Sequence, residues 1–156
     1  MRRTDREITD FKEMLSIVDA CDVVRIGLCD GPLPYIVPLN FGYECSDGRL
    51  IFYFHGAFEG RKMSLIKANG GFASFEMDTD HELLSGEAAC SYTYRYHSVM
   101  GEGRIELLSD PDEKKEGLRV ILKHYTDIEE LPMNEQIVSR TCIMKMTIEK
   151  WSCKGC

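Results

Sequence analysis

The sequence has no run of apolar residues as long as the roughly 18 that a membrane helix needs, so no membrane partner is expected. No apolar signal region follows the charged N-terminus, and we therefore expect a cytoplasmic protein. Basic residues are scarce as well: 19 Lys and Arg stand against 26 Asp and Glu, which gives a net charge of −7. Because nucleic acids are bound by basic surfaces, a nucleic-acid partner is not expected either.

Two common cofactor patterns are also missing. No G-x-G-x-x-G lies between a strand and a helix, which excludes a dinucleotide-binding Rossmann unit. His81, His97 and His124 have no partner at metal-ligand spacing, so no metal site is predicted. The seven cysteines are odd in number and scattered, which indicates reduced thiols rather than a disulfide framework.

A chain of 156 residues is most simply one domain, spanning 1–156. Apolar spacing predicts three helices, at residues 4–20, 60–67 and 110–125. The first is expected to start with a capping box of Thr4 and Glu7. Apolar alternation predicts strand segments at residues 23–29, 34–44, 50–54, 72–77, 88–108 and 141–150.

The remaining segments are predicted to be surface connections. They are residues 78–87, residues 126–135 and an exposed C-terminal tail over 150–156, which holds Cys153 and Cys156. The 88–108 segment is one long strand or two linked ones, so the count is six or seven antiparallel strands. The fold class is therefore mainly β with flanking helices, arranged as a small barrel.

The most informative stretch runs from Pro34 to Lys62. Two apolar and aromatic runs flank the turn signal Ser46-Asp47-Gly48, a β-hairpin pattern. Arg61 and Lys62 then open a helix, where cations oppose the helix dipole at a cost of roughly 0.3–1 kcal/mol each. Something negative is expected to offset them, so the pattern predicts a phosphate site beside an aromatic pocket.

Several short motifs in this sequence also resemble those of a known protein family. In chain order they are Met1-Arg-Arg3, Asp5-Arg-Glu7, Pro34-Tyr-Ile-Val-Pro38, Asn40-Phe-Gly-Tyr43, Tyr53-Phe-His-Gly-Ala57, Gly60-Arg-Lys62, Tyr96, Ser98-Val99 and Gly103-Arg104. The ordered set resembles the flavin-binding split-barrel family that includes pyridoxamine 5′-phosphate oxidases. It resembles most the branch called nitroimidazole-resistance proteins. The resemblance implies a split β-barrel that forms a homodimer with FMN at the subunit interface.

The resemblance also implies roles for the stretch just described. Arg61 and Lys62 would hold the FMN phosphate, although a solvated helix start has the same appearance. His55, followed by Gly56 and Ala57, would face the pocket and is the tentative catalytic proton donor, although a histidine at a strand end is often structural.

Two further groups are implied around the flavin ring. The first consists of consecutive residues beside the isoalloxazine, where main-chain groups can bond the ring: Val37, Pro38, Leu39 and Asn40. The second comes from the second subunit or from the chain end: Tyr96, Ser98, Val99, Trp151 and Lys154. Core packing and ordinary cross-strand pairs are the alternatives for both groups.

The predicted function is an FMN-dependent oxidoreductase acting on small molecules, with a nicotinamide donor docking transiently. The resemblance extends this to reduction of nitro-aromatics such as 5-nitroimidazoles. One alternative is a pyridoxamine 5′-phosphate oxidase, although Pro34-Tyr35 stands where oxidases place a basic residue. The other is a non-catalytic module that binds flavin or haem, in which His55 would ligate iron.

Overall fold

The computed structural model describes residues 3–128 and 132–156. The strands are β1 (Glu7–Ile8), β2 (Val24–Asp30), β3 (Leu33–Leu39), β4 (Gly42–Ser46), β5 (Arg49–Gly56), β6 (Phe72–Leu84), β7 (Thr93–Leu107) and β8 (Cys142–Gly155). The helices are the short 3-10 turns η1 (Thr4–Arg6) and η2 (Ala89–Ser91) and the α-helices α1 (Phe11–Asp19), α2 (Arg61–Ala68), α3 (Pro111–Tyr125) and α4 (Glu135–Arg140). Within the described ranges, no helix is both long and apolar enough to span a membrane.

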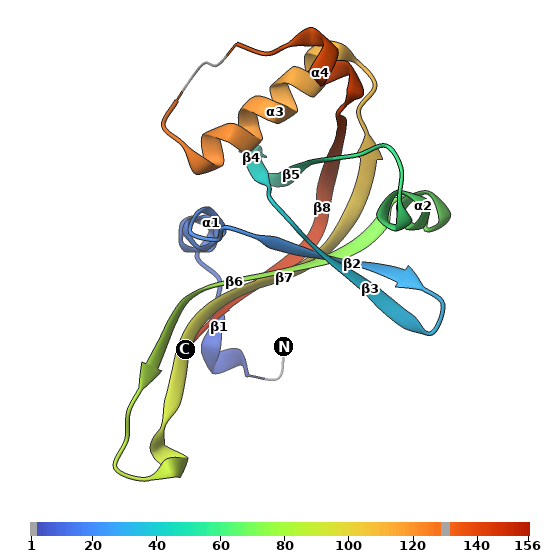
Figure 1. Ribbon diagram of the computed structural model, residues 1–156. Coiled ribbons are helices and arrows are strands. Elements are labelled where there is room, and N and C mark those ends of the chain that lie inside the picture. Colours follow the sequence, from blue (N-terminus) through green and yellow to red (C-terminus); the bar gives the residue numbers. More distant parts are fainter. Residues whose placement is uncertain (1–2, 129–131) are drawn as a thin grey trace.

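All strands belong to one antiparallel sheet with the order β3-β2-β6-β7-β8-β5-β4, and β1 pairs with β8. The sheet curves strongly but does not close, so β3 and β4 are its edges (Figure 1). This is the mainly β split barrel that the sequence predicts, but the described residues form eight strands instead of six or seven. Pro38 lies on edge strand β3, where a residue without an N–H donor is tolerated.

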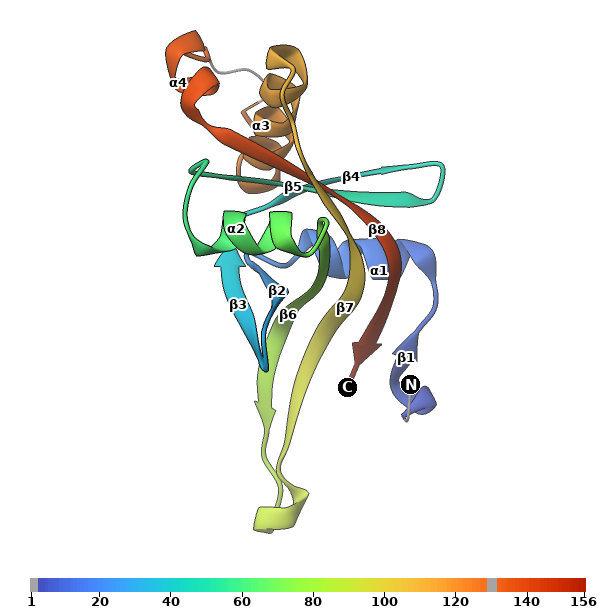
Figure 2. The same ribbon diagram turned by 90° about the vertical axis from the view of Figure 1, so that its right-hand side faces the viewer.

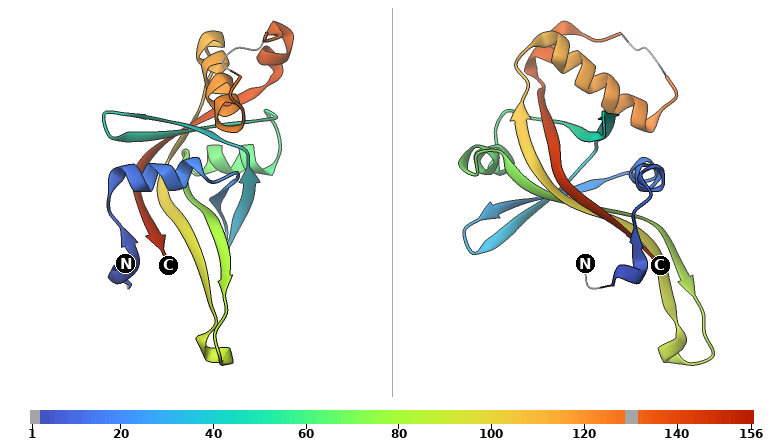
Figure 3. Two further views of the ribbon diagram at one scale, coloured as in Figure 1. Left: turned by 90° about the vertical axis from the view of Figure 1, so that its left-hand side faces the viewer. Right: turned by 180° about the vertical axis from the view of Figure 1, so that it is seen from behind.

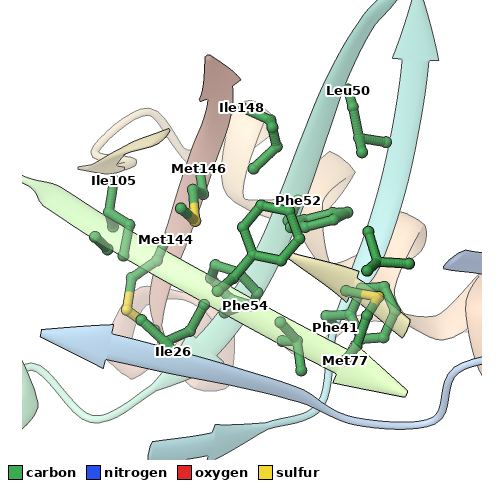
Figure 4. Close-up of a cluster of buried hydrophobic side chains, with 14 of the residues drawn as sticks. Ile26, Phe41, Leu50, Phe52, Phe54, Met77, Ile105, Met144, Met146 and Ile148 are labelled. Carbon is green, nitrogen blue, oxygen red and sulfur yellow. The ribbon is translucent and has the colours of Figure 1, made fainter. Parts of the chain in front are cut away.

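The main core lies on the concave side of the sheet (Figure 4). Phe52 and Phe54 of β5 are fully buried there because strand alternation turns both rings to the same side. The Phe52 ring packs edge-on against Phe41, with 5.5 Å between ring centroids. Burial of each such side chain is worth about 1.5–3 kcal/mol.

Helix α3 covers the opposite side of β5 and β8. Tyr53 and Ile143 turn away from the main core and pack beneath α3. Gly117 permits the close approach, since a Cβ at this position would lie 2.8 Å from Cγ2 of Ile143. The sequence predicted α3 correctly: Asp110 caps it through the N–H groups of the first turn, and Pro111 is its first residue.

The helix predicted over residues 4–20 is wrong in its first half. Helix α1 begins only at Phe11, where the carboxylate of Asp10 accepts a hydrogen bond from the first turn. The residues before it form η1 and β1, and β1 pairs with the end of β8. The capping box of Thr4 and Glu7 therefore does not form, because Glu7 belongs to a strand.

The strand predicted over 34–44 is two strands. Strand β3 pairs with β2, whereas β4 forms the predicted hairpin with β5. Their hairpin turn is Asp47-Gly48, where both residues have positive φ, as the sequence signal indicated. Asn40 and Phe41 lie between the two strands, and the chain changes partner there.

Three predicted connections also need correction. Residues 78–84 are not a loop, because β6 continues to Leu84 beside β7. The segment after residue 134 forms the unpredicted α4, while residues 129–131 of the predicted connector lie outside the described residues. Residues 150–155 are not an exposed tail, because β8 continues to Gly155 and buries Cys153 completely.

Candidate functional site

The N-terminus of α2 follows the end of β5 through a short open loop. Gly60 precedes the helix with φ of 112°, a conformation that favours glycine, and no atom lies within 4 Å of where its Cβ would be. Arg61 and Lys62 are the first two helical residues, as predicted. Consecutive helical residues point about 100° apart, so the two cations face different surroundings.

Arg61 points toward the β2–β3 hairpin. Its guanidinium donates to the carboxylate of Asp30 through Nη2 and through Nε, the latter at 2.7 Å. It also lies 4.9 Å from the centre of the Tyr35 ring. The side chain of Arg61 is 67% exposed, so this pair ties α2 to the hairpin at the surface and leaves one face of the guanidinium accessible.

Lys62 points inward instead, toward the end of β5. Its Nζ would lie 2.9 Å from a Cβ at position 56, so the ammonium rests against the backbone of Gly56. Burial lowers the pKa of Lys62, and the nearby Cys142 thiol opposes that shift. Among the residues that the structure describes, no carboxylate lies within ion-pair distance of Lys62. A half-buried positive charge therefore faces the β5–α2 loop without a negative partner.

The rest of this loop is open to solvent. His55 is exposed and lies opposite Ile143, on the side of β5 that also carries Tyr53. Ala57 and Phe58 follow it and are exposed as well. The structure thus brings His55, Gly56 and Lys62 together at one end of the sheet, which is where the sequence placed the phosphate end of the site.

Three members of the second predicted group, Tyr96, Ser98 and Lys154, lie on the outward side of the sheet. Ser98 and Lys154, on β7 and β8, face each other across the ladder and line a depression of about 340 Å³. The ammonium of Lys154 lies 5.8 Å from the centre of the Tyr96 ring, and its proximity lowers the pKa of the Tyr96 hydroxyl. Tyr96, Ser98 and Lys154 therefore belong to β7 and β8, whereas Arg61 and Lys62 belong to α2.

The other predicted site residues belong to the packing of the barrel. Val37 and Leu39 pack against the main core, and Val99 is fully buried. Trp151 packs edge-on against Phe11, with ring centroids 5.9 Å apart. β3 is an edge strand, so the main-chain N–H and C=O groups along one of its sides have no strand partner. These groups are available to a cofactor, and main-chain contact is what the sequence analysis expected of this strand. Pro38 and Asn40 are exposed.

Sequence reasoning missed two charged residues near the site. Asp30 ends β2, and no local pattern in the sequence indicates that α2 returns to this position. Lys114 of α3 is 4% exposed, donates to the carbonyl of Ser139 at 3.2 Å and lies 5.2 Å from the centre of the Phe58 ring. Helical spacing places Lys114 on the same face of α3 as Gly117 and Ile121, so the 3.6-residue period gave a signal for its burial that its charge obscured.

Comparison with known proteins identifies the family. A model of the pyridoxamine 5′-phosphate oxidase family matches residues 10–154, so this chain belongs to that family. Among solved structures, a candidate 5-nitroimidazole antibiotic resistance protein from Bacteroides thetaiotaomicron has a TM-score of 0.83 and 29% identity, over 96% of this chain and 86% of the other. The resemblance predicted from sequence motifs is confirmed at this level. No curated protein matches the chain.

Two more distant structures share the fold. The flavocytochrome Anf3 from Azotobacter vinelandii has a TM-score of 0.81 and 23% identity, over 100% of this chain and 72% of the other. An FAD and haem binding protein from Mycobacterium smegmatis has a TM-score of 0.80 and 17% identity, over 96% and 73%. At these identities the likeness concerns the fold alone.

Proposed function

We propose that this protein is a flavin-binding oxidoreductase that takes FMN, with the phosphate at the N-terminus of α2. The observation that carries the proposal is the half-buried ammonium of Lys62, which has no carboxylate partner in the described chain and lies at a helix N-terminus. Free backbone N–H groups and the helix dipole favour an anion there. Family membership and the flavin-binding proteins of the same fold support the choice of a flavin phosphate.

The residues at this end of the sheet fit a phosphorylated cofactor. Lys62 would donate to the phosphate from the inner side, and the N–H groups of the first turn of α2 would donate along the helix axis. Arg61 would contribute from the outer side while still held by Asp30. The open space around Gly60 allows an anion to approach the backbone closely.

The bound flavin would carry the electrons, and the protein would bind, orient and shield it. His55 is exposed next to Gly56, so it can hold a proton close to a substrate that enters from solvent. Edge strand β3 would offer main-chain donors and acceptors to the ring. We place the substrate among small molecules, and the resistance-protein relative supports a nitro-aromatic substrate such as a 5-nitroimidazole.

The same proposal includes a homodimer with the flavin at its interface. Tyr96, Ser98 and Lys154 lie on the outward side of the sheet, away from α2, so they reach a flavin phosphate site only in a second copy. A nicotinamide donor would dock transiently, since the chain has no Rossmann unit. The seven free cysteines, three of them buried, are compatible with the reducing cytoplasm, where we place the protein.

The test is a titration of the purified protein with FMN and with riboflavin, followed by absorbance and flavin fluorescence. We expect tight binding of FMN and much weaker binding of riboflavin, because riboflavin lacks the phosphate. The variant Lys62→Met should lose about 1.5–3 kcal/mol of FMN affinity, the value of a charge-assisted hydrogen bond. Lys67→Met, which removes an exposed lysine from the last turn of the same helix, is the matched control.

Equal affinity for FMN and riboflavin, or an unchanged affinity in Lys62→Met, would contradict the phosphate assignment. If no flavin binds, titration with haem comes next. An intense Soret band that disappears in His55→Ala would then favour the haem-binding alternative.

A further inference from the structure

Lys114 is the one charged residue that is buried in the described part of the chain, with 4% of its surface exposed. It lies in the first turn of α3, and its ammonium donates to the carbonyl of Ser139, in the last turn of α4, at 3.2 Å. The ammonium also lies 5.2 Å from the centre of the Phe58 ring. A carbonyl and an aromatic ring offset a positive charge only in part, because neither carries a net negative charge.

The protein gives Lys114 no carboxylate partner. Within residues 3–128 and 132–156, no acidic side chain lies within ion-pair distance of its ammonium. The next residue, Lys115, is different, because its ammonium lies 2.6 Å from the carboxylate of Glu135 and 3.7 Å from that of Asp112. A buried charge without an opposite charge is costly. The described chain therefore leaves the positive charge of Lys114 without a counter-charge.

This charge lies next to the candidate phosphate site. Figures 2 and 3 show α2 on one side of the loop that joins it to β5, and α3 with α4 on the other side. Phe58, the ring beside Lys114, belongs to this loop. Burial raises the pKa of Cys142, which pairs with the last residue of β5, and the positive charges of Lys62 and Lys114 oppose that shift. Two ammoniums without counter-charges therefore act on the same end of β5, one from α2 and one from α3.

The number of these charges indicates the kind of anion that fits. At pH 7 a phosphomonoester carries a charge of about −1.5 to −2, because its second pKa is about 6. A phosphodiester lacks the second ionisable oxygen and carries a single negative charge. Arg61 adds little to the count because Asp30 already pairs with it, and Glu59 of the same loop is exposed, where solvent screens its charge. Lys62 and Lys114 together match the doubly charged group.

We infer that Lys114 is a specificity-determining residue of the candidate phosphate site, whose buried charge selects a terminal phosphate with two negative charges over a phosphodiester with one. Lys114 acts through its electric field and needs no contact with the ligand. The identity of the ligand as a flavin rests on the proposed function, whereas the preference for two charges belongs to the site itself. The competing explanation is that Lys114 only caps α4, because a cation at a helix C-terminus is stabilising.

The test compares FMN with its methyl ester, riboflavin 5′-(methyl phosphate), which has the same flavin and a single negative charge. The affinity for each ligand is measured by flavin fluorescence at about pH 7.5, where the FMN phosphate is doubly charged. Electrostatic energy is proportional to the charge of the ligand, so a loss of about 5-fold for the ester corresponds to about 25-fold for FMN. Lys114→Gln should therefore lower the preference for FMN over the ester by about 5-fold.

A second variant separates the charge of Lys114 from its hydrogen bond. Lys114→Gln keeps a donor for the carbonyl of Ser139, whereas Lys114→Met removes both the donor and the charge. An electrostatic role should change the preference equally in both variants. The loss of a helix cap would lower the melting temperature of Lys114→Met and leave the preference unchanged. Lys115→Met, which removes a charge that Glu135 and Asp112 already offset, is the matched control and should keep the wild-type preference.

An unchanged preference in Lys114→Gln would overturn the role of Lys114, and tight FMN binding by that variant would leave the proposed function in place. The same comparison with phenyl phosphate and methyl phenyl phosphate, followed through the melting temperature, involves no flavin. A preference for phenyl phosphate that requires Lys114, in a protein that binds no flavin, would support the inference and remove the proposed function. Equal stabilisation by the two phenyl compounds, or none by either, would overturn the inference.

Discussion

The ammonium of Lys62 lies against Gly56, so close that a side chain at position 56 would have its Cβ 2.9 Å from Nζ. The colliding atom is the far end of a flexible side chain rather than backbone. A substitution at Gly56 should therefore move Lys62 and leave the strand in place. A substitution at Gly56 can therefore alter the candidate phosphate site without a large change in the stability of the fold.

We predict that Gly56→Ala lowers FMN affinity by about 10-fold, with little change in melting temperature. This loss, about 1.4 kcal/mol, is close to the lower end of the roughly 1.5–3 kcal/mol that a charged hydrogen bond contributes. Gly101→Ala is the contrasting variant, since its Cβ would meet the carbonyl of Lys150 and the ring of Phe75. Gly101→Ala should unfold at a clearly lower temperature. Equal losses of stability in the two variants would show that Gly56 is a structural glycine.

The two cations of α2 should contribute unequally. Arg61 is held at the surface by Asp30, whereas Lys62 has no acidic partner in the described chain. We expect Lys62→Ala to weaken FMN by about 1.5–3 kcal/mol and Arg61→Ala by less, because a shared and exposed charge contributes about 1 kcal/mol or less. Isothermal titration of both single variants decides this, and a larger loss in Arg61→Ala would reverse the assignment.

The pH dependence of stability should reflect the lowered pKa of Lys62. Burial lowers its pKa below the ordinary value of 10.5, so near that pH the folded protein binds fewer protons than the unfolded chain. Stability of the flavin-free protein should therefore rise with pH through the window just below 10.5, relative to Lys62→Met. At neutral pH the charged lysine costs stability, and Lys62→Met should melt higher by at most about 2 °C.

Lys67→Met again serves as the control for the melting experiment. A lower melting temperature in Lys62→Met without flavin would mean that the ammonium is stabilised by a partner inside the protein. The anion would then not be needed to explain the position of Lys62.

Cysteine reactivity should divide six of the seven thiols into two classes, with the partly exposed Cys156 between them. Burial raises the pKa of Cys21 and of Cys153 to about 12 and also raises that of Cys142. These three should resist a thiol reagent until the protein unfolds, whereas the exposed Cys29, Cys45 and Cys90 should react at once. Mass spectrometry after brief labelling checks this. Rapid labelling of Cys153 would mean that the end of β8 is not paired as described.

Local signals in the sequence predicted some elements well. Helix α3 was found because Asp110, Pro111 and the apolar spacing all lie within the element itself. The start of α2 was found for the same reason. Residues 7–8 and 150–155 were misread because their strand structure depends on distant partners. Residues 150–155 pair with β7, and Glu7 pairs with Lys154 at the other end of the chain.

Prediction from local sequence signals is limited in the same way at the candidate site. The sequence located Arg61 and Lys62 at a helix start but could not show that one faces Asp30 and the other Gly56, since both neighbours come from other elements. Likewise, alternation assigned residues 88–108 to strands, but it could not show that β7 begins only at Thr93 or that its first residues extend away from the body of the protein (Figure 2). Long-range pairing decides both features, and it leaves little trace in a short window of residues.

The position of β8 also determines how this protein can be made. It is the last strand in the chain, yet it lies between β7 and β5 and joins the four strands on one side to the two on the other. Until residues 142–155 have left the ribosome, the two halves of the sheet share no strand, and the edges of β7 and β5 are unpaired. Completion of the sheet therefore waits for residues 142–155, and until they emerge the nascent chain exposes strand edges that a chaperone could protect.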